Sequence, residues 1–146
     1  MTESHTLRAS LALASRFENI EIAARTLAEL CRQAGHDGDA DYWLATALRE
    51  AVANAVRHGN QNDPTREVRV DYEIVDSVVT IRVEDDGDGF DPSDIPDPTD
   101  PANLLRPSGR GIFYMRQFMN HVEFGRSSSG GTAVVMVRDL AQTDTD

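Results

Sequence analysis

The sequence predicts an α+β fold, a two-layer sandwich in which a mostly antiparallel mixed sheet carries three main helices on one face. Two kinds of periodicity support this: some segments alternate apolar and polar residues as strands do, and others repeat apolar residues at helical spacing. Helices and hairpins are partly segregated along the chain, which favours helices packed against one side of an antiparallel sheet. At 146 residues and 40% hydrophobic content, we expect a single domain over residues 1–140 around one core.

The first half of the chain is expected to contain one strand and two helices. Residues 7–13 alternate in polarity and predict a strand. The first helix is predicted from four residues at helical spacing, Ile20, Ala24, Leu27 and Cys31. Gly35 is its expected end. A second helix is predicted from about residue 41 to residue 57, and residues 60–64 form a turn-rich break.

The second half is expected to contain two hairpins that flank a long loop and a third helix. The hairpin strands are predicted at residues 68–74, 79–83, 121–126 and 132–138. Five prolines between Pro92 and Pro107 exclude a continuous helix or a central strand there, so a functional lid or a disordered segment is expected. The third helix is expected to begin near Ser108 and to bury Met119. Residues 141–146 are expected to be a disordered polar tail.

Composition excludes several classes of function. The formal net charge of -11 argues against direct nucleic-acid binding, which requires basic side chains on phosphates. All 14 basic residues are arginines, and without lysine neither a P-loop nor a eukaryotic-type protein kinase site can form. Neither a membrane-spanning apolar run nor a signal-peptide pattern is found, so a cytoplasmic location without membrane attachment is expected. The single cysteine, Cys31, is expected to lie in the core.

Three polar residues of the predicted second helix lie four residues apart, namely Glu50, Asn54 and His58. At about 3.6 residues per turn they form one stripe, which borders the apolar side of the helix. Such a stripe either faces a cleft between helix and sheet or is an ordinary solvated flank, and the spacing alone leaves both interpretations open.

An acidic, glycine-rich segment follows the strand that ends near Val83. Asp85 has the same parity as Val83 and should point to the core side, where a carboxylate needs partners or a functional reason. Gly87 and Gly89 would allow the backbone to approach a flat ligand closely. The alternative interpretation is a tight acidic turn.

A second glycine-rich segment, Gly109-Arg110-Gly111, lies at the expected start of the third helix. Free backbone N–H groups and the positive end of the helix dipole suit an anion there. The alternative is a flexible junction between loop and helix.

These motifs occur in an order that resembles the GHKL (Bergerat-type) ATPases. Residues 50–58 resemble the N-box of that superfamily, and Asp85-x-Gly87-x-Gly89 resembles its first glycine box. Residues 108–111 resemble the second glycine box, and residues 130–132 resemble the third. Within the superfamily, residues 113–122 and Arg25 are similar to the anti-sigma factor serine/threonine kinases.

The resemblance implies a role for each matching residue. Asn54 would ligate Mg²⁺, Glu50 would be the general base, and Arg25 would contact the γ-phosphate or the protein substrate. Asp85 would accept a hydrogen bond from the adenine amino group, with Thr132 nearby. The segment that would cradle the phosphates comprises Ser108, Gly109, Arg110 and Gly111. Either Arg57 or His58 would supply a basic group near Asn54, and helix phase favours His58.

By the same resemblance, the expected activity is transfer of the γ-phosphoryl group of ATP to serine or threonine. The expected substrate is a STAS-type anti-anti-sigma protein, and the expected partner is a sigma factor that the chain sequesters. A homodimer is also expected. The alternative function is an ATP-sensing, partner-binding switch with little or no phosphotransfer, although the glutamate at position 50 argues against it.

Overall fold

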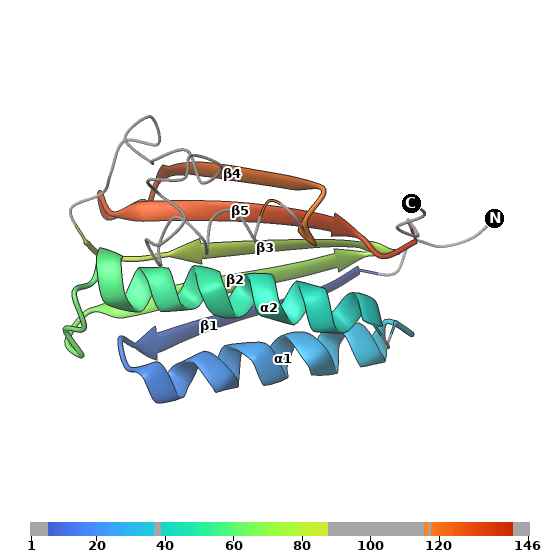
Figure 1. The fold of residues 1–146 in the computed structure, drawn as a ribbon, viewed down its shortest axis with the longest axis horizontal. Helices are drawn as coiled ribbons and strands as arrows, with labels where there is room; N and C mark the ends of the chain where they lie inside the picture. The colour runs from blue at the N-terminus through green and yellow to red at the C-terminus, as the bar shows by residue number, and fades with distance from the viewer. Residues whose placement is uncertain (1–5, 37–38, 88–115, 117, 142–146) are drawn as a thin grey trace, which may run out of the picture.

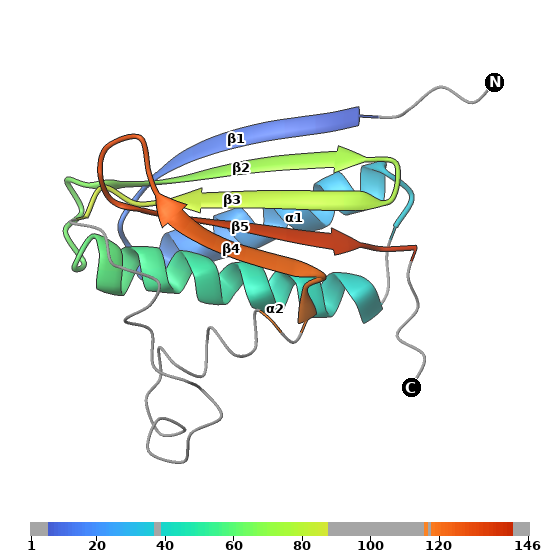
Figure 2. The same ribbon diagram turned by 90° about the horizontal axis from the view of Figure 1, so that it is seen from above.

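The computed structural model describes residues 6–36, 39–87, 116 and 118–141, which form a five-stranded sheet with two helices on one face (Figures 1 and 2). The strands are β1 (Thr6–Ala14), β2 (Glu67–Val75), β3 (Val78–Glu84), β4 (His121–Arg126) and β5 (Thr132–Asp139). The helices are α1 (Ile20–Gln33) and α2 (Asp39–Asn54), with a short 3-10 turn η1 (Phe17–Asn19) and a π-helical turn η2 (Ala55–Gly59).

The sheet confirms the predicted strands and their pairing sense. Its strand order is β1-β2-β3-β5-β4, and all four described pairings are antiparallel. Alternation decides which side chains are buried, because successive residues of a strand point to opposite faces. In β2, for example, the apolar residues Val68, Val70 and Ile74 are almost fully buried, whereas Asp71 is exposed.

Helices α1 and α2 run side by side across the apolar face of the sheet (Figure 1). The hydroxyl of Tyr72 on β2 donates a 2.8 Å hydrogen bond to the carbonyl of Ala23 on α1, which fixes the helix against the sheet. Burial raises the pKa of Tyr72, so this hydroxyl stays a donor at physiological pH. Cys31 is fully buried in the core, as predicted.

The second helix differs from the prediction at both ends. It begins at Asp39, two residues earlier than expected, and its regular hydrogen bonding ends at Asn54. Residues Ala55–Gly59 form a π-helical turn, and the N–H of Asn60 donates to the carbonyl of Ala55, five residues back. Such turns are rare and occur frequently at functional sites.

Several predicted features lie outside the described residues, namely the long loop, the start of the third helix and the polar tail. Of the third helix, Arg116 and Phe118 have helical backbone, and Met119 is buried in the core as expected. Among the described residues, no helix is long and apolar enough to cross a membrane.

Candidate functional site

Asp85 lies directly after β3 and is only 4% exposed, on the core side that its parity predicts. Its backbone is held on both sides. The N–H donates to the carbonyl of Thr132 at 2.9 Å, and the carbonyl accepts a 2.9 Å hydrogen bond from Ser127 Oγ. The residue is therefore fixed to both ends of the turn between β4 and β5.

The two carboxyl oxygens of Asp85 differ in their partners. Oδ1 accepts hydrogen bonds from the backbone N–H groups of Gly87 (2.9 Å) and Thr132 (3.0 Å). Oδ2 accepts none from any residue that the structure describes. Burial raises the pKa of Asp85, and these two backbone donors oppose that rise. The result is an oriented carboxylate with one oxygen left to accept a hydrogen bond.

Three glycines pack closely at Asp85. A Cβ at Gly59 would overlap Oδ2 of Asp85, and a Cβ at Gly131 would overlap its Oδ1 and its backbone carbonyl. Gly87 is also required by the packing of the chain itself, because a Cβ there would overlap the backbone carbonyl of Gly59. The acceptor, the Asp85 carboxylate, is surrounded by backbone and not by side chains. Such surroundings suit a ligand that presents an N–H donor on a flat ring.

The glycine at position 59 gives a sharp test of this packing. We expect Gly59→Ala to destabilise the fold by about 1–3 kcal/mol, because the new methyl displaces the Asp85 carboxylate. Gly125→Ala is the matched control, since a Cβ there meets nothing within 4 Å. Thermal unfolding of both variants provides the measurement, and equal melting temperatures would contradict the described packing.

Behind Asp85, the next residue is held by a charged network on the opposite face of the sheet. Asp86 accepts hydrogen bonds from Arg69 (2.9 Å) and from Ser129 Oγ (2.8 Å), and Arg69 also reaches Glu84 at 3.3 Å. Partial burial of Asp86 acts to raise its pKa, but Arg69, Ser129 and the N–H of Glu67 together hold that pKa below its usual value. The network fixes the position of Asp86 and, through the peptide bond between them, that of the Asp85 backbone.

The predicted stripe lies on α2 and its π-helical extension. Glu50 and Asn54 are half-buried, and neither makes a hydrogen bond or ion pair with a described residue. His58 is exposed, and so is Arg57, whose guanidinium lies 5.2 Å from the centre of the Phe17 ring, on the η1 side. The functional groups of Glu50 and Asn54 are thus not engaged within the described structure.

Arg25 lies exposed on α1, one turn after Glu21. The pKa of Glu21 is lowered mainly by its hydrogen bond with Arg49 and more weakly by Arg25. Among the described residues, Arg25 makes no hydrogen bond or ion pair with Glu50 or Asp85. The remaining predicted site residues lie outside the described residues, namely Gly89, Ser108, Gly109, Arg110 and Gly111.

Part of the surroundings of Asp85 carries no recognisable sequence motif. Gly59 and Asn60 were not assigned to the site, although His58-Gly59-Asn60 directly follows the polar stripe and ends the helix. No sequence motif includes Ser127, yet its hydroxyl donates a hydrogen bond to the carbonyl of Asp85. The pairing of β3 with β5 brings Ser127 to Asp85, and the packing of the end of η2 on the sheet brings Gly59 and Asn60 there.

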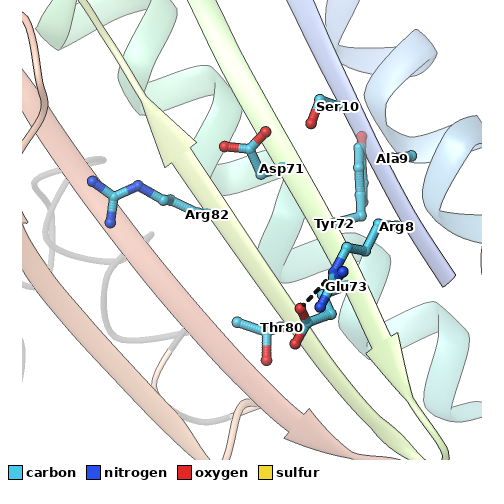
Figure 3. Close-up of a pocket in the computed structure, with 8 residues that line it drawn as sticks. All are labelled: Arg8, Ala9, Ser10, Asp71, Tyr72, Glu73, Thr80 and Arg82. Carbon is cyan, nitrogen blue, oxygen red and sulfur yellow. Dashed lines mark hydrogen bonds and ion pairs between the residues drawn. The ribbon is translucent and has the colours of Figure 1, made fainter. Parts of the chain in front are cut away.

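The open face of the sheet, opposite the helices, carries a shallow hollow that holds none of the predicted site residues (Figure 3). The Arg8–Glu73 ion pair, 3.0 Å long, lies within it. Its other polar lining residues include Ser10, Asp71, Thr80 and Arg82. The hollow is therefore separate from the Asp85 site.

Comparison with known proteins gives consistent results. Residues 13–138 match the family described as the histidine kinase-like ATPase domain. The chain is 31% identical over 140 residues to the "Anti-sigma F factor" of Oceanobacillus iheyensis (93% of this chain, 94% of that protein). It is 32% identical over 137 residues to the protein of that name from Geobacillus kaustophilus (91% and 92%). It is 25% identical over 135 residues to the "Serine-protein kinase RsbW" of O. iheyensis (88% and 84%).

A solved structure supports the fold alone. The histidine kinase domain from the Erythrobacter litoralis EL346 blue-light activated histidine kinase superposes with a TM-score of 0.52 at 18% identity. The match covers 86% of this chain but only 61% of that one.

Proposed function

Because the chain belongs to the histidine kinase-like ATPase domain family, we propose that it is an ATP-dependent serine/threonine protein kinase that acts as an anti-sigma factor. It binds a sigma factor and phosphorylates a STAS-type anti-anti-sigma protein, in the cytoplasm and as a homodimer. The names of the relatives support both halves of this proposal, since they include anti-sigma F factors and a serine-protein kinase.

The observation that carries the proposal is the buried carboxylate of Asp85, whose Oδ2 has no hydrogen-bond donor among the described residues. The amino group of adenine offers such a donor, and glycine backbone, not side chains, lies closest to the carboxylate. Guanine carries a carbonyl at the corresponding position, which would oppose Oδ2. The site should therefore prefer ATP to GTP.

We assign the other residues the roles that their motifs imply. Asn54 offers a hard side-chain oxygen, which is the kind of ligand that Mg²⁺ uses together with substrate phosphates. When bound there, Mg²⁺ would neutralise charge on the phosphates. His58 lies on the π-helical turn η2 and would supply a basic group near the nucleotide. The phosphates would be held by Ser108, Gly109, Arg110 and Gly111, and Thr132 would lie beside the base.

Glu50 lies one helical turn before Asn54. Its carboxylate would therefore lie close to the γ-phosphate of the bound nucleotide. In the proposed step, the hydroxyl oxygen of the substrate attacks the γ-phosphorus and its proton passes to Glu50. The bond from the γ-phosphorus to the bridging oxygen breaks, and ADP leaves. Arg25 would contact the γ-phosphate or the incoming substrate.

Calorimetry and a phosphotransfer assay test the proposal together. We expect Mg²⁺-dependent binding of ATP, weaker binding of GTP, and phosphate on a serine or threonine of a STAS-type protein, detected by mass spectrometry. Absence of ATP binding at millimolar concentration would refute the site. ATP binding without phosphotransfer would favour an ATP-sensing switch.

The raised pKa of Asp85 predicts an acid-sensitive preference for adenine. Protonation turns Oδ2 from an acceptor into a donor that opposes the adenine amino group. Burial raises this pKa, and the charges of Asp86 and Arg69 act on it in opposite directions. On acidification, the preference for adenine should therefore begin to disappear at a higher pH than it would with an ordinary carboxyl group. A raised pKa also means that the folded protein binds the proton more readily than the unfolded chain, so this protonation does not destabilise the fold.

The measurement is the ratio of ATP to inosine triphosphate (ITP) affinities from neutral pH to about pH 5, above the range in which the adenine ring itself is protonated. The two nucleotides share the triphosphate, whose own titration cancels in the ratio. The ratio should fall on acidification in the wild type and stay constant in Asp85→Asn. A constant ratio in the wild type would contradict the role of Oδ2.

A further inference from the structure

The asparagine that follows the π-helical turn is fully buried and joins three segments of the chain. Asn60 is 0% exposed. Its side-chain nitrogen donates to Ser15 Oγ at 2.7 Å, just after β1, and to the carbonyl of Glu67 at 3.0 Å, at the start of β2. Its side-chain oxygen accepts the backbone N–H of Asp86 at 2.7 Å.

These contacts make the amide hard to replace. The N–H of Asp86 can only donate and the carbonyl of Glu67 can only accept, so the orientation of the amide is fixed. A carboxylate at this position would lack the donors, and an apolar side chain would leave the N–H of Asp86 without its acceptor, in a place where unpaired polar groups are costly.

Asn60 also adjoins Asp85 through its own neighbour. Gly59 contacts Oδ2 of Asp85 so closely that no Cβ fits between them, and its carbonyl packs against Gly87. Asn60 therefore acts on Asp85 from two directions, through Gly59 at the carboxyl oxygen and through Asp86 at the backbone. The backbone N–H of Asn60 donates to the carbonyl of Ala55. This hydrogen bond fixes Gly59 and Asn60 to the end of the helix that carries Asn54 and Glu50.

We propose that Asn60 is a positioning residue that aims the Asp85 carboxylate at the base of the nucleotide and so sets the preference for adenine. This inference rests on the proposed function, because it assigns Asn60 a role in the same nucleotide site. Asn60 does not contact the base, and its effect is exerted entirely through Asp85 and the two glycines beside it.

The test compares affinities for ATP and ITP, which differ in the group that would face Asp85. In Asn60→Ser, the shorter side chain cannot reach Asp86, and ATP should bind about tenfold more weakly. ITP affinity should change little, so the ratio of the two affinities falls about tenfold. A purely structural role would lower the fraction of active protein for both nucleotides and leave the ratio unchanged.

Two controls remove buried hydrogen bonds without touching Asp86. Ser15→Ala deletes one partner of Asn60 but leaves its bond to Asp86, and Tyr72→Phe deletes the bond to Ala23. Both should keep the wild-type ratio of ATP to ITP affinities. If either control lowers that ratio as much as Asn60→Ser does, the specific role of Asn60 is refuted.

The outcomes also separate the inference from the proposed function. A wild-type protein that binds ATP and ITP equally would refute the adenine site itself. A wild-type preference that persists in Asn60→Ser would refute only the role of Asn60. If Asn60→Ser does not fold, the side-chain amide NMR signals of wild-type Asn60 become the readout. They should shift with ATP and shift less with ITP, and an absent shift with ATP would refute the inference.

Discussion

Replacing Glu50 with glutamine is expected to reduce phosphotransfer about 10²–10⁴-fold while leaving ATP affinity unchanged. A general base typically contributes a factor of this size, and glutamine keeps the shape of glutamate but cannot accept a proton. Glu50 makes no hydrogen bond or ion pair with a described residue, so its loss should not disturb the fold. The measurement is the initial rate of phosphate incorporation into the STAS-type protein at saturating ATP.

Glu123→Gln is the matched control for this experiment. It makes the same chemical change on the exposed strand β4, and it should retain the wild-type rate. A normal rate in Glu50→Gln would show that another group, or the solvent, accepts the proton. A fall in ATP affinity parallel to the fall in rate would instead place Glu50 in nucleotide binding.

Replacing Asp85 with asparagine is expected to weaken ATP binding about 100-fold. A hydrogen bond to a charged acceptor contributes about 1.5–3 kcal/mol, and each 1.4 kcal/mol corresponds to a factor of ten. Asparagine can keep the oxygen that Gly87 and Thr132 bind, so its amino group would take the place of Oδ2 and oppose the adenine amino group. Calorimetric titration with Mg-ATP gives the affinity directly.

The same substitution at Asp71 provides the control, because this residue is exposed on β2, on the open face of the sheet (Figure 3). Asp71→Asn should bind ATP as the wild type does. Unchanged affinity in Asp85→Asn would mean that the nucleotide binds elsewhere. Tighter binding of ITP by Asp85→Asn would strengthen the assignment, because the new amino group can donate to the ITP carbonyl.

Local periodicity predicted most of the fold because each element buries one side. Alternation placed Val68 and Asp71 on opposite faces of β2, and it placed Asp85 on the core side. The spacing of Ala24, Leu27 and Cys31 gave the buried side of α1. These patterns depend only on the geometry of a single strand or helix. Their prediction therefore required no knowledge of which elements become neighbours.

The surroundings of the site depend on contacts between distant residues, which periodicity does not reveal. Alternation gives the face of Glu84, but its burial arises because Arg69 and Arg82 cover it. The closeness of Gly131 to Asp85 follows from the pairing of β3 with β5, and a pattern within one strand carries no information about its partner. The π-helical turn adds one residue to a helical cycle, so a regular wheel fails after Asn54.

The strand order has a consequence for protein synthesis. Strand β5 is translated after the other four described strands, yet it pairs with β3 and lies between β3 and β4. Thr132, its first residue, supplies one of the two backbone donors to the carboxylate of Asp85, 47 residues earlier in the chain. A nascent chain that has emerged only as far as β3 therefore carries Asp85 without that donor. Any stabilisation of the folding chain by bound nucleotide should therefore begin only after β5 has been translated.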